Sequence, residues 1–204
     1  MACLSIRGVT RRPWFEDLSL DLNAGDIVVL TGPSGSGKTL LLRALADLDA
    51  FDSGTVELDG CGREAIEPGE WRARVTYLHQ VPVRLPGDVR ENIQCVRALE
   101  SQVRRTGSSA MPEAEVAGRA GVSLETPVQH LSGGEAGRLA LYRAIASGPD
   151  VLLLDEPTAA LDEDAARVAE QALLAWARAG GAVLWVAHDR QLAQRLGARE
   201  WSLR

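Results

Sequence analysis

The sequence predicts an α/β fold in which a parallel sheet forms the core, a small antiparallel β layer lies beside it, and a helical subdomain interrupts it. Three observations support this prediction. Apolar runs of strand length, typical of parallel strands buried on both faces, occupy residues 27–30, 75–78, 151–154 and 182–187. The first sixty residues alternate between apolar and polar positions instead. Between residues 81 and 148 no such apolar strand occurs.

The alternation near the start of the chain predicts three strands of an antiparallel layer. An antiparallel sheet tolerates one solvated face, whereas a parallel sheet is covered on both faces, so this layer is expected beside the core and not within it. The apolar positions of the three strands are Leu4 and Ile6, then Leu18, Leu20 and Leu22, then Val56 and Leu58.

The middle of the chain predicts loops and helices. It is interrupted by prolines and by a polar run at residues 101–113 that is typical of a surface loop. We therefore expect a single domain over residues 1–204. Its core and β layer are predicted at residues 1–80 and 149–204, and its helical subdomain at residues 81–148.

The composition indicates a globular protein and limits its partners. Charged residues make up 25% of the chain and the formal net charge is −6, which argues against a nucleic-acid groove. The pairs Arg11-Arg12 and Arg104-Arg105 are expected to be solvated surface. No apolar run approaches the roughly 20 residues that cross a bilayer, and no signal peptide is recognised. Three separated cysteines predict neither a disulfide framework nor a zinc site, which favours a reducing cytoplasm.

A glycine-rich loop follows the first apolar run and fits the pattern G-x-x-x-x-G-K-[ST]. Its residues are Gly32, Pro33, Ser34, Gly35, Ser36, Gly37, Lys38 and Thr39. Leu41, Leu45 and Leu48 then recur at helical spacing. In a strand–loop–helix unit the free N–H groups and the helix dipole favour an anion. The lysine adds a charge for terminal phosphates and the threonine hydroxyl can bind Mg²⁺, so the loop predicts a nucleoside triphosphate site; the alternative is an ordinary glycine turn.

The third apolar run ends in two carboxylates, Asp155 and Glu156. Asp155 at the strand tip can hold the Mg²⁺ shell, and Glu156 can polarise a water for in-line attack on the γ-phosphate. An acidic strand end alone could also cap a helix. With a phosphate loop upstream, we interpret the pair as catalytic.

A second helix start suited to phosphate lies at Ser132, Gly133 and Gly134. One nucleotide cannot easily contact two such loops of one compact domain. The simplest solution is two copies that face each other, each lending this segment to the ATP of the other. We therefore expect an ATP-dependent homodimer.

In these motifs the chain resembles the ATP-binding cassette (ABC) ATPases. The resemblance rests on the loop, on the carboxylate pair, on the segment from Leu131 to Glu135, and on three further positions at Gln80, Asp162 and His188. It covers essentially the whole chain and implies a P-loop NTPase with a RecA-like core. It departs from the common pattern at Glu135, where many members have glutamine, and at Ala159, where serine is common.

The resemblance also implies roles for the remaining residues. Gln80 is expected to touch Mg²⁺ and the attacking water and to sense the transporter, and His188 to contact the γ-phosphate. Asp162 is expected to bridge the two copies. The adenine base is expected on an early aromatic, for which Trp14 is favoured over Phe15, although either ring could instead serve the core or an interface.

The family resemblance implies a transporter subunit on the cytoplasmic face of the cell membrane. Since no span is recognised, a multi-span membrane permease on a separate chain is expected as the partner. Residues 81–94 are the candidate docking segment, with an ordinary loop as the alternative. A weaker resemblance to a subgroup of metal (iron) exporters points to metal efflux. Two alternatives stay open, a regulatory role similar to that of cell-division cassettes and lipid or lipoprotein handling; a P-loop small-molecule kinase has no use for the Ser-Gly-Gly segment.

Overall fold

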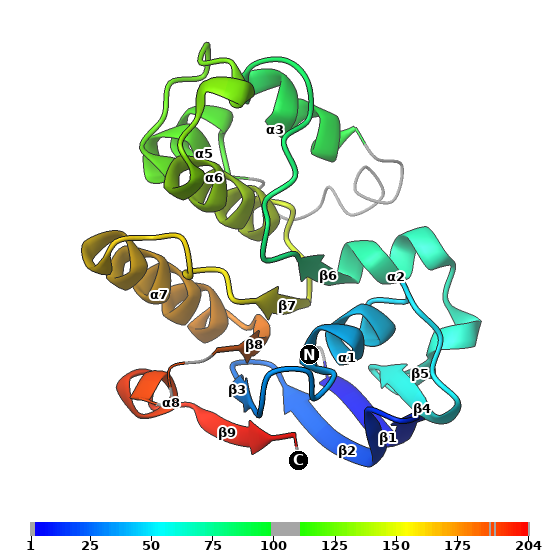
Figure 1. Ribbon diagram of the computed structural model, residues 1–204. Coiled ribbons are helices and arrows are strands. Elements are labelled where there is room, and N and C mark those ends of the chain that lie inside the picture. Colours follow the sequence, from blue (N-terminus) through cyan, green and yellow to red (C-terminus); the bar gives the residue numbers. More distant parts are fainter. Residues whose placement is uncertain (1–2, 99–110, 188, 190, 204) are drawn as a thin grey trace.

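The computed structural model describes residues 3–98, 111–187, 189 and 191–203. Two sheets form a body, and a cluster of helices lies to one side of it, above the body in the view of Figure 1. The chain enters this cluster after one edge strand of the parallel sheet and returns into the neighbouring strand. Because these two neighbouring strands are parallel, their carboxyl ends lie at the same edge of the sheet.

The larger sheet has five parallel strands in the order β6-β7-β8-β3-β9. Their bounds are β3 (Ile27–Thr31), β6 (Val75–Leu78), β7 (Val151–Asp155), β8 (Ala182–Val186) and β9 (Arg199–Ser202). Every residue of the three central strands β7, β8 and β3 is buried, as their apolar sequences predict. The edge strand β9 was not predicted, because its sequence Arg-Glu-Trp-Ser is short and mostly polar and exposed.

The smaller sheet is antiparallel, with the order β2-β1-β4-β5. Its strands are β1 (Cys3–Arg11), β2 (Phe15–Asn23), β4 (Ser53–Leu58) and β5 (Cys61–Gly62). Leu4, Ile6 and Val56 belong to the same buried apolar cluster as β3 and the helix that follows it. The predicted layer with one solvated face is therefore confirmed, and its buried face packs in one cluster with the elements on both sides of the glycine-rich loop.

Helices cover the parallel sheet and build the separate cluster (Figure 1). Those of the body are α1 (Lys38–Leu45), α2 (Pro68–Arg74), α7 (Glu163–Arg178) and α8 (Gln191–Leu196), with a 3-10 turn η1 (Arg63–Ala65). The helical spacing that included Leu48 overestimated the length of the first helix. α1 ends at Leu45, the chain turns at Asp47 with φ of 58°, and Leu48 is exposed.

The helical cluster has an apolar core of its own. It contains α3 (Val89–Arg97), α5 (Glu113–Ala120), η2 (Val128–His130) and α6 (Gly133–Ala146). Side chains from all four meet, among them Ile93, Val116 and Leu139. Among the described residues, no helix combines the length and apolar character that a membrane crossing requires.

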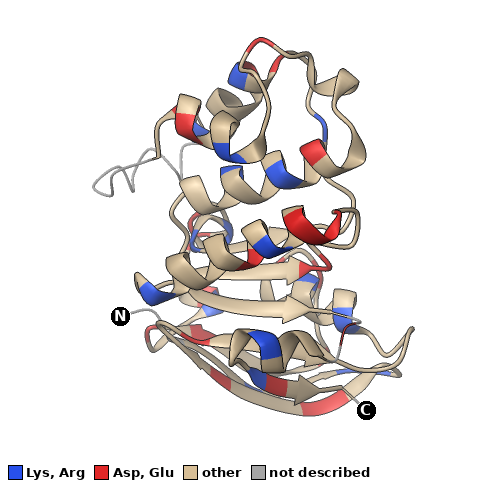
Figure 2. Ribbon diagram, turned by 90° about the vertical axis from the view of Figure 1, so that its left-hand side faces the viewer, with Lys and Arg blue, Asp and Glu red and all other residues tan. Residues whose placement is uncertain are grey.

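Basic and acidic residues are interspersed along the same elements (Figure 2). Many of them pair, for example Arg74 with both Asp59 and Asp150 at 2.6 Å. Arg104 and Arg105 lie outside the described residues. Arg11 is not the solvated residue that was expected: its side chain is only 22% exposed and pairs with Asp49.

Candidate functional site

The glycine-rich loop connects β3 to α1 and leaves the start of this helix without a side-chain cap. Gly37 is the N-cap residue, with φ of 91°. A Cβ atom there would lie 2.8 Å from the Cβ of Trp14, so both the backbone conformation and the close contact require glycine. The first N–H groups of α1 are therefore free to bind an anion.

Lys38 is held against this loop. The residue is only 7% exposed, and its Nζ donates hydrogen bonds to the carbonyls of Gly32 (2.9 Å) and Pro33 (2.8 Å). The hydroxyl of Ser36 is buried and has no hydrogen-bond partner among the described residues. A charged amine and a spare hydroxyl in one loop fit a phosphate chain.

Asp155 ends β7 beside the loop and is only 3% exposed. One of its oxygens, Oδ2, accepts two hydrogen bonds, from the Thr39 hydroxyl (2.8 Å) and from the Tyr77 hydroxyl (3.1 Å). Burial raises the pKa of Tyr77, and the charge of Asp155 raises it further, so the phenol stays protonated and donates. Tyr77 was missed by the sequence analysis. The available signal was its position on β6, which pairs with β7.

Glu156 follows directly and contacts Gln80. The Gln80 side-chain amide donates a 3.1 Å hydrogen bond from Nε2 to Glu156 Oε2. The backbone of Glu156 has φ of 51°, and its N–H donates to the Val186 carbonyl on the neighbouring strand. Non-glycine residues with positive φ are uncommon and cluster at functional sites. This backbone conformation accompanies a carboxylate that lines a cavity.

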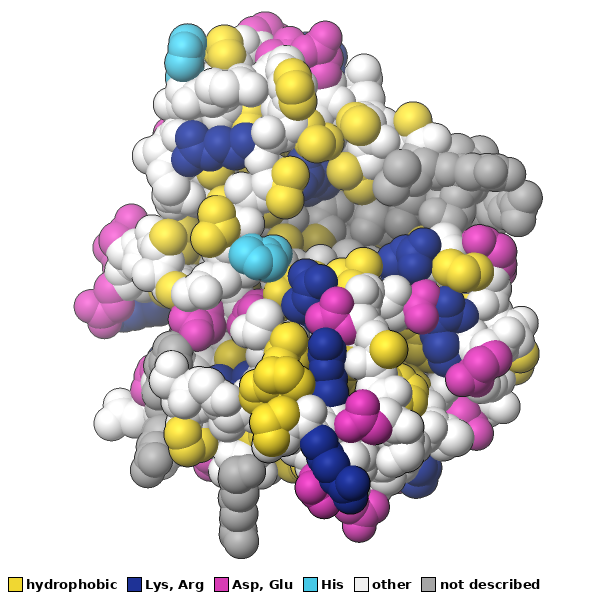
Figure 3. All heavy atoms as spheres, turned by 45° about the vertical axis from the view of Figure 1, so that its right-hand side comes forward, with side chains coloured by type: hydrophobic (Ala, Val, Ile, Leu, Met, Phe, Trp, Pro, Cys, Tyr) yellow, Lys and Arg dark blue, Asp and Glu magenta, His cyan; other side chains and the backbone are white. Residues whose placement is uncertain are grey.

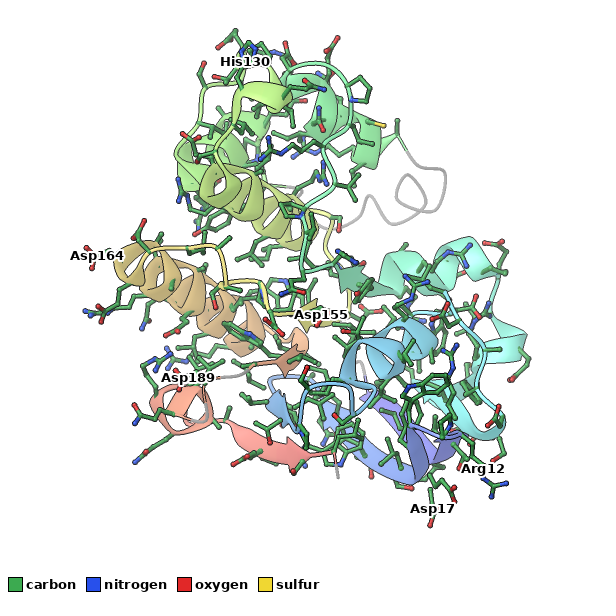
Figure 4. All side chains as sticks on the ribbon, viewed as in Figure 1. Arg12, Asp17, His130, Asp155, Asp164 and Asp189 are labelled. Atoms are coloured by element: carbon green, nitrogen blue, oxygen red, sulfur yellow. The ribbon has the colours of Figure 1, made fainter. Side chains whose placement is uncertain are left out.

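Lys38, Gln80 and Glu156 line one cavity of about 450 Å³, called here the loop cavity, and Asp155 joins it through its bond to the lining residue Thr39. It is lined by Trp14, Ser34, Gly35, Gly37, Lys38, Thr39, Leu40, Gln80, Glu156 and Val186. The structure thus brings together residues from the first 80 positions with residues near position 156. Figure 4 shows the labelled Asp155 at the junction between the body and the helical cluster.

The oxygen donors at this cavity fit Mg²⁺. A hydroxyl and a carboxylate oxygen lie 2.8 Å apart at Thr39 and Asp155. Among the described residues there is no cluster of three His, Cys, Asp or Glu side chains for a metal held by protein alone. Mg²⁺ typically takes one or two protein ligands and completes its shell with water and substrate phosphates, which is the arrangement these donors permit.

The two candidate aromatics differ in environment. Phe15 is 4% exposed and packs in the main apolar cluster, whereas Trp14 is 41% exposed and lines the loop cavity. A buried ring cannot offer a face to a base. Trp14 is therefore the ring that is available for stacking.

The Ser-Gly-Gly segment lies apart from the loop cavity. None of Ser132, Gly133 and Gly134 is among the described residues that line it. Ser132 instead caps α6 by a reciprocal pair of bonds: Glu135 N–H donates to the serine hydroxyl (3.2 Å), and Ser132 N–H donates to the Glu135 carboxylate (2.8 Å). That bond from the serine backbone lowers the pKa of Glu135. Glutamate at this position therefore has a capping role.

Asp162 is not among the described residues that line the loop cavity. Asp162 caps α7, where its carboxylate accepts a 2.9 Å hydrogen bond from the Ala165 N–H. The segment before Asp162 lies against the first turn of α6, since a Cβ on Gly134 would lie 3.5 Å from the Ala160 carbonyl. His188 lies outside the described residues, so the structure adds nothing to its expected role.

Comparisons with known proteins match this geometry. The model of the ABC transporter family matches residues 15–159, well over half of the chain. The aliphatic sulfonates import ATP-binding protein SsuB 2 of Paracoccus denitrificans is 37% identical over 204 residues, which cover 97% of this chain and 76% of that protein. Protein STAR1 of Oryza sativa subsp. japonica is 34% identical over 200 residues, which cover 95% of this chain but only 58% of STAR1.

Solved structures share the fold. An ATP-binding subunit of an ABC transporter superposes with a TM-score of 0.85 at 19% identity, over 98% of this chain and 85% of that one. The ATP-binding cassette MJ0796, in a dimeric post-hydrolysis state bound to ADP and Pi, gives a TM-score of 0.80 at 24% identity, over 98% and 94%. The α/β fold with its RecA-like core, the phosphate loop and the family match agree: the chain belongs to the ABC transporter family, of which it is an ATP-binding, ATP-hydrolysing domain.

Proposed function

We propose that this chain binds Mg-ATP in the loop cavity and drives a transporter by pairing with a second copy of itself. The observation that carries the proposal is the gathering of phosphate-binding, metal-binding and water-activating groups at one cavity, while the Ser-Gly-Gly segment stays outside it. We also propose that residues 1–80 and 149–204 act as the nucleotide-binding core and residues 81–148 as a helical subdomain. The separate apolar core of the helices supports this division.

The side chains at the cavity have distinct tasks in this proposal. Lys38 and the amides of residues 32–37 hold the phosphates, and Thr39 and Asp155 hold the magnesium ion, which neutralises phosphate charge when bound. Glu156 takes the proton of the attacking water through its Oε atoms. Gln80, already bonded to Glu156, orients that carboxylate. As a lining residue of the cavity it is also proposed to contact the magnesium ion.

The second copy completes the site from outside. Ser132 and the first turn of α6 offer a helix N-terminus, to which a γ-phosphate could add hydrogen bonds and favourable dipole energy. The solved dimer of MJ0796 supports pairing as a property of this fold. Asp162 and His188 are proposed to act at the same junction, Asp162 as a bridge between copies and His188 as a γ-phosphate contact.

A multi-span permease on a separate chain is the proposed membrane partner, which would place this chain on the cytoplasmic face of the membrane. Val81 and Val83 support the docking segment at residues 81–94, since both are exposed by more than 60% (66% and 63%) directly after Gln80. Figure 3 shows hydrophobic side chains exposed on the helical part and again on the body beneath it. Exposed apolar residues at such a junction suit a partner helix.

The proposal is compatible with more than one transported substrate and with either direction of transport. Names of relatives include import of sulfonates, hemin, and spermidine/putrescine, which favours solute import. Metal (iron) efflux is the hypothesis that the sequence motifs support. A regulatory, cell-division-like role or lipid and lipoprotein handling is the alternative. Stimulation of ATP hydrolysis by a candidate solute, in membranes that contain the co-purified permease, distinguishes these functions.

The pairing itself is tested by sedimentation of a Glu156→Gln variant, which is expected to retain ATP. With Mg-ATP the mass should rise from monomer to dimer, and with ADP it should not. Constant mass at every accessible concentration, with and without the membrane partner, would contradict the shared site.

A further inference from the structure

Trp14 lies at the turn between β1 and β2 and is covered on one side by an arginine. Its backbone N–H donates a 3.0 Å hydrogen bond to the Arg11 carbonyl, which closes the turn. The guanidinium carbon of Arg11 lies over the indole at 5.6 Å from the ring centroid. Trp14 lines the loop cavity and Arg11 does not. The guanidinium thus covers the ring without being part of the cavity lining.

The arginine is itself anchored. Arg11 Nη1 donates a 3.3 Å hydrogen bond to Asp49 Oδ2. Arg43, on α1, holds both oxygens of the same carboxylate at 2.9 Å. The Arg43 bonds, together with Arg11 and against the effect of burial, lower the pKa of Asp49 to about 2, so the carboxylate is ionised at neutral pH. Arg11 thus connects the indole to the helix that follows the phosphate loop.

The start of the Trp14 side chain lies close to the phosphate loop. A Cβ atom at Gly37 would be only 2.8 Å from the Cβ of Trp14, so the chain at Trp14 passes close to the N-cap of α1. The loop thus limits the position of the Trp14 Cβ, and the Arg11 guanidinium covers one face of the indole.

We infer that Arg11, anchored by Asp49 and Arg43, is a positioning residue that presents the Trp14 indole as a platform for the purine base. This inference rests on the proposed nucleotide site and on Trp14 as its aromatic. A cation stacked on one face leaves the other for a base, and base–aromatic stacking tolerates such a sandwich. A ring that is already oriented loses less conformational freedom when the base binds.

The test separates base binding from phosphate binding. Isothermal titration with Mg-ADP, and with pyrophosphate in competition against ADP, is performed on the full chain and on Arg11→Ala, Trp14→Ala and the double variant. Stacking on Trp14 contributes about 1–3 kcal/mol, so Trp14→Ala should weaken ADP binding roughly 5- to 150-fold. A cation–π contact of about 0.5–1 kcal/mol predicts a loss of roughly 2- to 5-fold for Arg11→Ala. The double variant should be no weaker than Trp14→Ala, and pyrophosphate binding should not change.

Arg12→Ala is the matched control, because it removes the same charge one residue away. Arg12 is exposed, pairs with Glu16 at 3.0 Å and points into solvent in Figure 4. The Arg12→Ala variant should bind both ADP and pyrophosphate in the same ratio of affinities as the wild type. Thermal unfolding of each variant shows whether a loss of fold contributes.

The outcomes distinguish the role of Trp14 in nucleotide binding from the role of Arg11 in positioning it. Unchanged ADP affinity in Trp14→Ala would remove Trp14 from the nucleotide site. A loss in Trp14→Ala without any loss in Arg11→Ala would overturn the inference about Arg11 alone. The inference also fails if Arg11→Ala weakens ADP and pyrophosphate alike, or weakens ADP further once Trp14 is absent.

Discussion

The start of α1 and the start of α6 are both helix N-termini that suit a phosphate, but only the start of α6 is capped by a side chain. α1 begins at Gly37, which has no side chain to cap it. α6 begins at Ser132, whose hydroxyl is bonded to the Glu135 N–H in a capping box. Around the first, the same chain supplies Lys38 and the other residues of the loop cavity. The second has a complete cap of its own.

In the proposed dimer, the start of α1 binds phosphate within one chain, and the start of α6 acts on the nucleotide of the other copy. An uncapped helix start has N–H groups that need water or a ligand, whereas a capped start is satisfied without one. The α6 end is therefore stable in a single copy and can still add a phosphate through its remaining N–H groups. Each variant below changes one of these two helix starts or the residues around it.

Glu156→Gln should have the largest effect. It keeps the size of the side chain and removes the basic oxygen, so single-turnover hydrolysis should fall by about 10²–10⁴-fold. ATP affinity should remain close to wild type, because Lys38, Thr39 and Asp155 are unchanged. Near-normal turnover would exclude Glu156 as the base and favour a helix-capping or salt-bridging role.

Lys38→Ala should abolish the loop cavity as a phosphate site. Charge-assisted hydrogen bonds contribute about 1.5–3 kcal/mol each, so two lost contacts predict ATP binding weaker by at least roughly 100-fold. Equilibrium binding of ATP measures this loss. Unlike Glu156→Gln, the variant should not form an ATP-loaded dimer, and unchanged affinity would contradict the assignment of the loop.

Ser132→Ala tests the other helix start, that of α6. Loss of the cap should cost about 1 kcal/mol of the free energy of unfolding, while ATP-dependent pairing should weaken and ATP binding by single copies should not. Asp88→Ala is the matched control, because Asp88 and Glu91 form the same kind of capping box on α3. Thermal unfolding and sedimentation with ATP are measured on both. Equal pairing of the two variants would show that Ser132 acts only as a cap.

Tyr77→Phe should have the smallest effect of the four. It removes one of the two hydrogen bonds to Asp155 Oδ2 and leaves that from Thr39. A net hydrogen bond of about 0.5–1.5 kcal/mol predicts a roughly 2- to 10-fold higher Mg²⁺ concentration for half-maximal ATP binding. Nucleotide binding in the presence of EDTA should not change. If nucleotide affinity in EDTA fell as much as it does with Mg²⁺, Tyr77 would have a general structural role.

The sequence by itself determined the fold class and most of the loop cavity. The phosphate loop is a contiguous segment, and Asp155 and Glu156 follow an apolar strand, so both are visible without coordinates. The ends of parallel strands meet at one edge of a sheet, which is why Gln80 after β6 lies within 3.1 Å of Glu156 after β7. The buried strands were predictable for the same reason, because burial on both faces requires uninterrupted apolar residues.

Tertiary structure alone decided the contacts between distant segments that no local pattern encodes. Trp14 and Phe15 are neighbours in sequence and alternate across a strand end, and only packing shows which ring is buried and which faces the cavity. The contacts of Tyr77 with Asp155, and of Arg11 with Asp49, join residues that are 78 and 38 positions apart. Arg11 was expected to be solvated surface because it stands beside a second arginine in the sequence. Its carboxylate partner, Asp49, is brought to it only by the fold.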